Sequence, residues 1–121
     1  MLGTKALQIF DQTTSVVRAV LRWTEFYKHE SCGKCSPCRE GSSWLVQTMR
    51  RIVAKRGRTE DLETLVDLCK NIEGRTVCAF GDAEVAPIMS TLKHWRPEYV
   101  MLIHEAEAAN LIMPEPAGVR H

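Results

Sequence analysis

Four cysteines with an uneven spacing are the residues of this sequence best suited to chemistry. Cys32, Cys35 and Cys38 fall within seven residues, and Cys78 follows after a gap of 39 residues. A [4Fe–4S] cube needs one terminal thiolate on each of its four irons, which a three-sulfur loop and one distant segment can supply. Zinc also binds four thiolates, but its common structural sites use two separated pairs of ligands. The spacing therefore favours an iron–sulfur cluster, and with it an electron-transfer module.

The fifth cysteine, Cys69, competes with Cys78 for the place of the fourth ligand. No secretory signal is found, and an odd cysteine count fits a disulfide framework poorly. Cys69 shares an apolar helical face with Leu65 and Ile72, which predicts a buried and inert thiol. Cys78 lies in a short connection after Gly74 and is free to turn towards the cysteine loop. The sequence therefore favours Cys78.

Three residues near the cysteines are candidates for contacts with the cluster. A cube with four thiolates carries net negative charge, so its surroundings are expected to offset that charge. Gly33 allows the loop backbone to come close, while Lys34 and Arg39 can add positive charge. The alternative is a purely structural role, in which Gly33 only allows a turn and both cations are solvated surface charges. The histidines are isolated from any nucleophile, so no catalytic residue is expected.

Amphipathic helices are expected to position these residues. The first is predicted to begin near Thr14. The second is predicted to have Ser36 as its cap, Pro37 at its first position and Cys38 in its first turn. A basic stretch before Gly57 is typical of a helix end, which makes the second helix about 16 residues long.

Three further helices follow in the predicted order. Thr59 is expected to cap the third, Gly81 and Asp82 the fourth, and a shorter fifth helix is expected to restart at Pro97. Residues 5–10 alternate weakly in hydropathy and predict one short strand. The pattern predicts an all-α fold: a small four-helix bundle carrying the cluster, with a short N-terminal strand remnant and a flexible C-terminal tail.

Composition limits the size and the partners of the molecule. With 121 residues, 45% of them hydrophobic, the chain can close one compact domain. Sixteen Lys and Arg against fifteen Asp and Glu leave a formal charge of +1, so no nucleic-acid partner is expected. No apolar run approaches the roughly 20 residues that a membrane span needs. We expect a soluble chain, peripheral to a membrane at most.

Residues 26–41 (FYKHESCGKCSPCREG) closely resemble the iron–sulfur motif of the NADH-binding flavoprotein subunit of respiratory complex I. Residues 72–83 (IEGRTVCAFGDA) are similar to the segment of that family that brings the fourth cysteine, and residues 94–98 (HWRPE) to the stretch after it. The resemblance covers roughly residues 3–105. The ligands that it implies are Cys32, Cys35, Cys38 and Cys78, with no such role for Cys69.

The resemblance also implies a fold and an electron path. In that family a C-terminal four-helix bundle holds one [4Fe–4S] cluster, which takes electrons from flavin mononucleotide reduced by NADH and passes them towards quinone. Residues 1–12 would be the end of a preceding β-domain or a linker, residues 13–109 the bundle and residues 110–121 the tail. The implied partners are other subunits of the peripheral arm, including a flavin-binding chain or domain. The implied location is cytoplasmic, at the inner face of the cell membrane, or the mitochondrial matrix side.

The largest departure from the family is that its flavin- and NADH-binding domain has no counterpart in this sequence. We therefore expect the chain alone neither to bind NADH nor to transfer hydride. It would be either a fragment of a longer polypeptide or the product of a split gene. Smaller departures are Phe80, where Leu is more usual, and Ala86, where Trp is common; both concern packing more than ligation.

Two other functions compete with a relay in an NADH:quinone oxidoreductase. The first is the same module in the diaphorase part of a soluble NAD-linked hydrogenase or formate dehydrogenase. The second is a redox-silent protein-binding module, in which a metal only holds the helical bundle together. The identity of the co-purifying subunits distinguishes the first alternative from the relay in an NADH:quinone oxidoreductase. Reversible redox activity distinguishes that relay from the second alternative.

Overall fold

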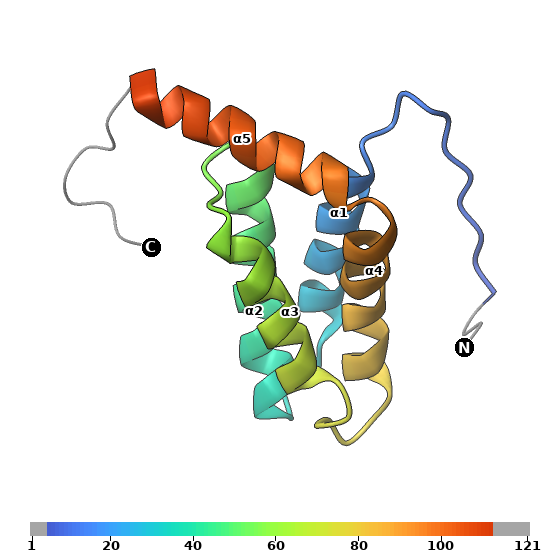
Figure 1. Cartoon of the computed structure of the whole chain (residues 1–121). Helices are drawn as coiled ribbons and strands as arrows, with labels where there is room; N and C mark the ends of the chain where they lie inside the picture. Colours follow the sequence, from blue (N-terminus) through green and yellow to red (C-terminus); the bar gives the residue numbers. More distant parts are fainter. Residues whose placement is uncertain (1–4, 113–121) are drawn as a thin grey trace.

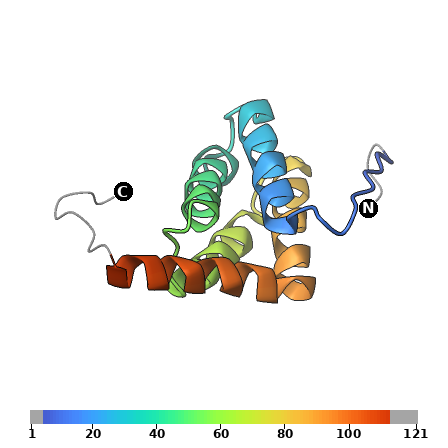
Figure 2. The same cartoon turned by 90° about the horizontal axis from the view of Figure 1, so that it is seen from above.

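The structure is a computed structural model that describes the backbone of residues 5–112 and the side chains of residues 5–108. This part of the chain forms five helices. The helices are α1 (Val16–Glu30), α2 (Ser36–Val53), α3 (Glu60–Ile72), α4 (Phe80–His94) and α5 (Arg96–Ile112). Helices α1 to α4 run side by side, and α5 lies across one end of them (Figures 1 and 2). The predicted all-α class and the four-helix bundle are confirmed.

The core lies between the four bundle helices and beneath α5. It is built from the apolar face of each helix, as helical periodicity requires. Its fully buried members include Val20 of α1, Leu45 of α2, Leu65 of α3, Ile88 of α4 and Tyr99 of α5. Among the described residues, no helix combines the length and the apolar character that crossing a membrane requires.

Helix α5 is tied to the bundle by polar contacts as well as by its apolar face. The carboxylate of Glu98 accepts hydrogen bonds from the Ser15 hydroxyl and from the Val16 backbone N–H at 3.3 Å, so α5 caps the start of α1. The Tyr99 hydroxyl lies 2.9 Å from Thr91 Oγ1 of α4. These contacts fix α5 at the end of the bundle from which α1 begins.

The strand predicted for residues 5–10 is wrong. The structure shows no strand between residues 5 and 112. A strand needs a neighbouring strand to satisfy its backbone hydrogen bonds, and the described part of the chain supplies none. Residues 5–10 instead run as exposed chain before α1.

Several helix ends differ from the predicted ones. Ser36 is the first residue of α2, and Cys35 is its N-cap. Helix α2 ends at Val53 because Lys55, at φ +59°, takes the left-handed position that Gly57 was expected to supply. The Arg56 N–H then bonds to the Arg51 carbonyl at 2.9 Å, which completes a Schellman turn.

The later helices also begin or end elsewhere than predicted. Thr59 does not cap α3 with its side chain, which instead donates to Glu107 at 3.2 Å. Helix α4 begins at Phe80, ahead of Gly81 and Asp82, and Asp82 accepts a hydrogen bond from the Gly74 N–H at 2.7 Å. Helix α5 is 17 residues long, longer than α1, α3 and α4, and continues past residue 109 to Ile112. The rest of the predicted tail, residues 113–121, lies outside the described residues.

Candidate metal centre

The four predicted cysteine ligands lie around one cavity. The α1–α2 and α3–α4 connections meet at the end of the bundle opposite α5 (Figure 1). Between them is a cavity of about 180 Å³. Its lining residues are Glu30, Ser31, Cys32, Lys34, Cys35, Cys38, Thr76, Cys78, Phe80 and Gly81. Two connections that are distant in sequence thus bring four thiols to one place.

The start of α2 positions the first three cysteines. Cys35 is the N-cap, and Cys38 is the third residue of the helix, behind Pro37. Gly33 has φ +74°, a backbone conformation that residues with a side chain rarely adopt, and the loop turns at this position. Arg39 holds this turn, because its Nη1 donates to the Gly33 carbonyl at 2.7 Å and its Nη2 to Ser36 Oγ at 3.3 Å.

The connection between α3 and α4 positions Cys78. Gly74, at φ +68°, ends α3. The Thr76 hydroxyl donates to the Cys78 carbonyl at 2.8 Å, and the Val77 N–H donates to Cys35 Sγ at 3.5 Å. The second contact joins the two connections across the cavity. Thr76 packs so closely on Gly81 of α4 that a Cβ there would lie 2.4 Å from its hydroxyl oxygen.

Cys38 is the buried member of the four, and two polar groups contact its sulfur. Ser31 Oγ lies 3.2 Å from Cys38 Sγ, and Glu84 Oε2 of α4 lies 3.9 Å from it. Burial raises the pKa of Cys38 above its ordinary value, and the hydrogen bond to Ser31 opposes that rise. Glu84 is 1% exposed, and burial raises its pKa to about 7. Among the described residues, its Oε1 has no hydrogen-bond partner.

The electrostatic setting suits an anionic group. Helices α2 and α4 both begin beside the cavity, so their positive ends and unsatisfied N–H groups face this end of the bundle. Lys34 lines the cavity, whereas Gly33 and Arg39 do not. Arg39 acts on the loop through the Gly33 carbonyl and forms an ion pair with Glu40. A direct contact of Gly33 or Arg39 with the cluster therefore stays a prediction.

Cys69 lies in the core, as its helical position predicted. Its side chain is 0% exposed, among the buried residues of α3, and it does not line the cavity. Burial raises the pKa of Cys69 to about 12, which keeps the thiol protonated at neutral pH. Cys78, by contrast, is exposed in its connection.

The residues at the cavity fit a [4Fe–4S] cluster. They supply four soft sulfur donors from two segments, which is the donor set that such a cluster takes. No three described His, Cys, Asp or Glu side chains converge on a point that could hold a single ion. The sulfurs surround a space of about 180 Å³ instead, which has room for a group of several atoms.

Sequence reasoning missed three residues of this site. Ser31 precedes the first cysteine and follows the last residue of α1, so its position as a helix cap was the available signal. Thr76 gave none, because its contact with Cys78 depends on an irregular connection. Glu84 had a signal: it falls between Gly81 and Ile88 at helical spacing, on the buried face of α4.

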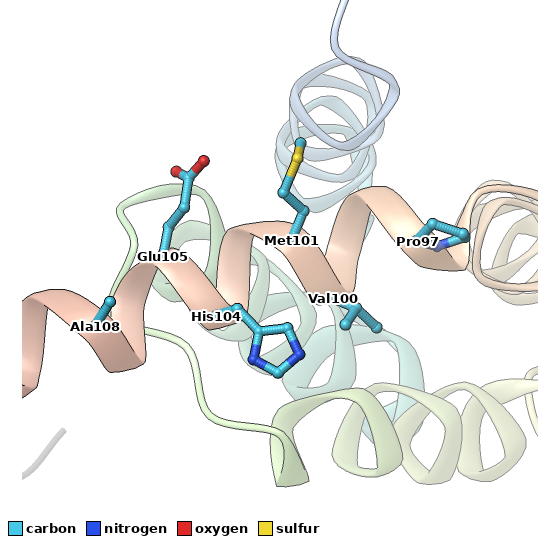
Figure 3. Close-up of a pocket in the computed structure, with 6 residues that line it drawn as sticks. All are labelled: Pro97, Val100, Met101, His104, Glu105 and Ala108. Carbon is cyan, nitrogen blue, oxygen red and sulfur yellow. The ribbon is translucent and has the colours of Figure 1, made fainter.

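A second hollow, of about 550 Å³, lies along the outer surface of α5 (Figure 3). All six of its lining residues come from α5: Pro97, Val100, Met101, His104, Glu105 and Ala108. It is wide open and holds no thiol. Of these two hollows, the cysteine cavity is the one whose lining includes thiols.

A family model described as the NADH-ubiquinone oxidoreductase-F iron-sulfur binding region matches residues 18–102. One subunit of the NADH-quinone oxidoreductase of Streptomyces coelicolor is 63% identical over 99 residues, which are 82% of this chain and 22% of the relative. The 51 kDa subunit of the mitochondrial NADH-ubiquinone oxidoreductase of Neurospora crassa is 50% identical over 97 residues, 80% of this chain and 20% of the relative. The chain thus spans about a fifth of the length of these curated relatives.

Solved structures give a further likeness. A chain in the crystal structure of an NAD+-reducing [NiFe]-hydrogenase in the air-oxidised state matches with a TM-score of 0.72 at 30% sequence identity. The match covers 79% of this chain and 16% of that chain. The same bundle is therefore found in two kinds of NAD-linked oxidoreductase.

Proposed function

The chain belongs to the family of NADH-ubiquinone oxidoreductase-F iron–sulfur binding regions, and we propose that it relays electrons through a [4Fe–4S] cluster within a larger oxidoreductase. The proposed ligands are Cys32, Cys35, Cys38 and Cys78. One observation carries the proposal: thiols from two segments that are 40 residues apart in sequence line one cavity beside two helix N-termini.

When bound, the cluster supplies a centre that accepts and releases one electron at a time. The residues of this chain hold it and set its surroundings. Cys38 fixes it to the rigid first turn of α2, while Cys32 and Cys78 lie at the exposed rim. Lys34 and the positive ends of α2 and α4 offset its negative charge.

The proposed electron path runs from NADH through flavin mononucleotide to this cluster and on towards quinone. Flavin and NADH would be bound by another domain or chain, and residues 13–109 would form the cluster-binding unit. The proposed partners are subunits of the peripheral arm of NADH dehydrogenase, at the inner face of the cell membrane or on the matrix side in a mitochondrion. The 63% identity to the Streptomyces coelicolor relative supports this assignment.

The second candidate is the same module in an NAD-linked hydrogenase or formate dehydrogenase. The likeness to the NAD+-reducing [NiFe]-hydrogenase supports it, at about half the identity found for the quinone-linked relative. Native isolation followed by mass spectrometry of the associated polypeptides separates the two. Quinone-oxidoreductase subunits support the first candidate, and hydrogenase or formate dehydrogenase subunits support the second.

The ligand set is tested by two substitutions in the iron-loaded chain. We expect Cys78→Ser to abolish the EPR signal of the reduced [4Fe–4S] cluster, because one iron then loses its thiolate. The matched control is Cys69→Ala, which should keep the signal because Cys69 lies in the core. The reverse result would overturn the assignment.

A redox-silent, metal-stapled bundle is the remaining alternative. It predicts a colourless, zinc-loaded protein even when the chain is prepared anaerobically. The relay predicts iron and acid-labile sulfide in the same sample, and a centre that is reduced and reoxidised reversibly between about −700 and +450 mV.

A further inference from the structure

Ser31 contacts both the loop and a proposed ligand of the cluster. Its Oγ lies 3.2 Å from Cys38 Sγ, and the Gly33 N–H donates to the same oxygen at 3.3 Å. Ser31 is also the C-cap of α1, and its own N–H bonds to the Tyr27 carbonyl at 3.0 Å. The hydroxyl therefore has a fixed backbone and two fixed neighbours.

The direction of the hydrogen bond follows from what each atom can do. A hydroxyl has one proton to donate and lone pairs to accept with. The Gly33 N–H occupies an accepting position of Ser31 Oγ. A cysteine sulfur that ligates iron is a thiolate and has no proton to donate. With Cys38 as a ligand, the hydrogen bond between these two atoms can therefore be donated only by the Ser31 hydroxyl.

We propose that Ser31 is a positioning and tuning residue, whose hydroxyl donates a hydrogen bond to the Cys38 thiolate and thereby raises the reduction potential of the cluster. This inference rests on the ligand set proposed above. Hydrogen bonds to the sulfurs are one of the levers by which a protein sets the potential of such a cluster.

The physical reason is the change of charge on reduction. One electron from an external donor enters the cluster, and no covalent bond forms or breaks. The negative charge on the thiolate sulfurs increases, so a hydrogen bond to one of them becomes stronger. The Ser31 proton stays on its oxygen throughout. The hydroxyl thus stabilises the reduced form more than the oxidised form.

The same geometry distinguishes Ser31 from the other serine of the loop. The Ser36 hydroxyl accepts from Arg39 Nη2 at 3.3 Å, and no hydrogen bond from it to a cysteine sulfur is found among the described residues. Ser36→Ala therefore removes a hydroxyl from the same loop without removing a donor to sulfur. It is a matched control for loosening of the loop.

The test is a potentiometric titration, followed by EPR, of the iron-loaded full chain isolated with its associated polypeptides. We expect Ser31→Ala to lower the equilibrium constant for reduction on the order of tenfold, which for a one-electron couple is about 59 mV. Ser31→Thr keeps a hydroxyl at an extended backbone position and should keep the reduction potential of the unchanged chain. Ser36→Ala should leave the potential unchanged.

Three results of the potentiometric titration would overturn the proposal. They are an unchanged potential in Ser31→Ala, an equal shift in Ser36→Ala, and a shift in Ser31→Thr as large as that in Ser31→Ala. Ser31→Gly repeats the test with a variant that also lacks the methyl group that alanine places next to the sulfur. Loss of iron from both Ser31→Ala and Ser31→Gly would also overturn it, in favour of a purely structural hydroxyl. Absence of the cluster signal from the unchanged chain would instead contradict the proposed function.

Discussion

Cys38 and Cys69 are both buried thiols, but their neighbours give them different chemistry. Cys38 lies at the cavity, with the Ser31 hydroxyl at 3.2 Å and the Glu84 carboxyl at 3.9 Å. Cys69 lies among apolar side chains of the core, and its pKa is raised to about 12 by burial. Ligation requires a thiolate that can reach the metal, so position relative to the cavity matters more than burial alone.

Cys69 is predicted to resist alkylation in the folded, metal-free chain at pH 8. With a pKa of about 12, only about one thiol in ten thousand is ionised at that pH, and no reagent reaches a side chain that is 0% exposed. Cys32 and Cys78 are exposed and should react quickly. Iodoacetamide labelling followed by peptide mass spectrometry measures both rates.

The control for that experiment is the same chain in denaturant, where all five cysteines should be labelled. Labelling of Cys69 in the folded chain as fast as that of Cys78 would show that α3 does not hold it in the core.

At the scale of the helices, the start of α4 controls the segment that carries Cys78. Gly81 allows Thr76 to pack on the helix, and Thr76 in turn bonds to the Cys78 carbonyl. A methyl group on Gly81 would lie 2.4 Å from Thr76 Oγ1 and 3.0 Å from its Cβ, so the whole side chain must move. The position of the fourth ligand thus depends on a glycine three residues away.

Gly81→Ala is predicted to lower the iron content of the purified chain while leaving its helical circular dichroism unchanged. The displaced Thr76 no longer holds Cys78 at the cavity. Gly41→Ala is the matched control, because its new Cβ would lie 2.6 Å from Ile72 Cδ1, in the core between α2 and α3. It should cost about 1–3 kcal/mol of stability by overpacking and keep its iron. Equal iron in both variants would contradict this account.

Helix existence could be predicted from the sequence, because apolar residues recur at helical spacing in every bundle helix. Helix ends were less predictable. Lys55 occupies the left-handed position that ends α2, although Gly57 lies two residues later and tolerates that conformation better. The later turns of α5 contact the segment between α2 and α3 through the ion pair of Glu105 with Lys55 and the hydrogen bond of Glu107 with Thr59, which no local pattern shows.

The ligand set at the site could be proposed from spacing and resemblance, because three cysteines in one loop are a local pattern. The groups that surround the sulfurs could not. Ser31, Thr76 and Glu84 act through contacts whose distances depend on how the two connections meet. A sequence gives no distance between a hydroxyl and a sulfur seven residues away unless the turn between them is known.

At the scale of the whole molecule, the bundle and the cavity depend on different residues. The core cluster includes none of the four proposed ligands, and α5 covers the end of the bundle away from them (Figure 1). A cluster bound to both connections would link Cys38 to Cys78 and close a loop of roughly 40 residues. Metal binding should therefore stabilise the fold without creating it.

Removal of iron is predicted to lower the free energy of unfolding by roughly 4 kcal/mol, the value that a covalent link closing such a loop gives by chain entropy. The metal-free chain should keep its helical circular dichroism and unfold at a lower denaturant concentration. Equilibrium unfolding in urea, with and without the cluster, measures the difference. Cys78→Ser, treated with the same chelator, is the control and should show no change in midpoint.

A chain that is fully unfolded without metal would show that the core alone is too small to fold. An unchanged midpoint would show that the cluster does not bridge the two connections.

The open rim of the cavity has a consequence for how the molecule is handled. Cys32 and Cys78 are exposed, and the Val77 side chain between the connections is 87% exposed. Because these two thiols are exposed, an electron donor can come close to the sulfurs. The rim admits dioxygen as readily, and an electron lost to dioxygen leaves superoxide beside the ligands. The exposed rim through which the cluster would exchange electrons is thus also where the cluster would be most easily oxidised in air. A neighbouring polypeptide bound to that rim would both supply electrons and exclude dioxygen.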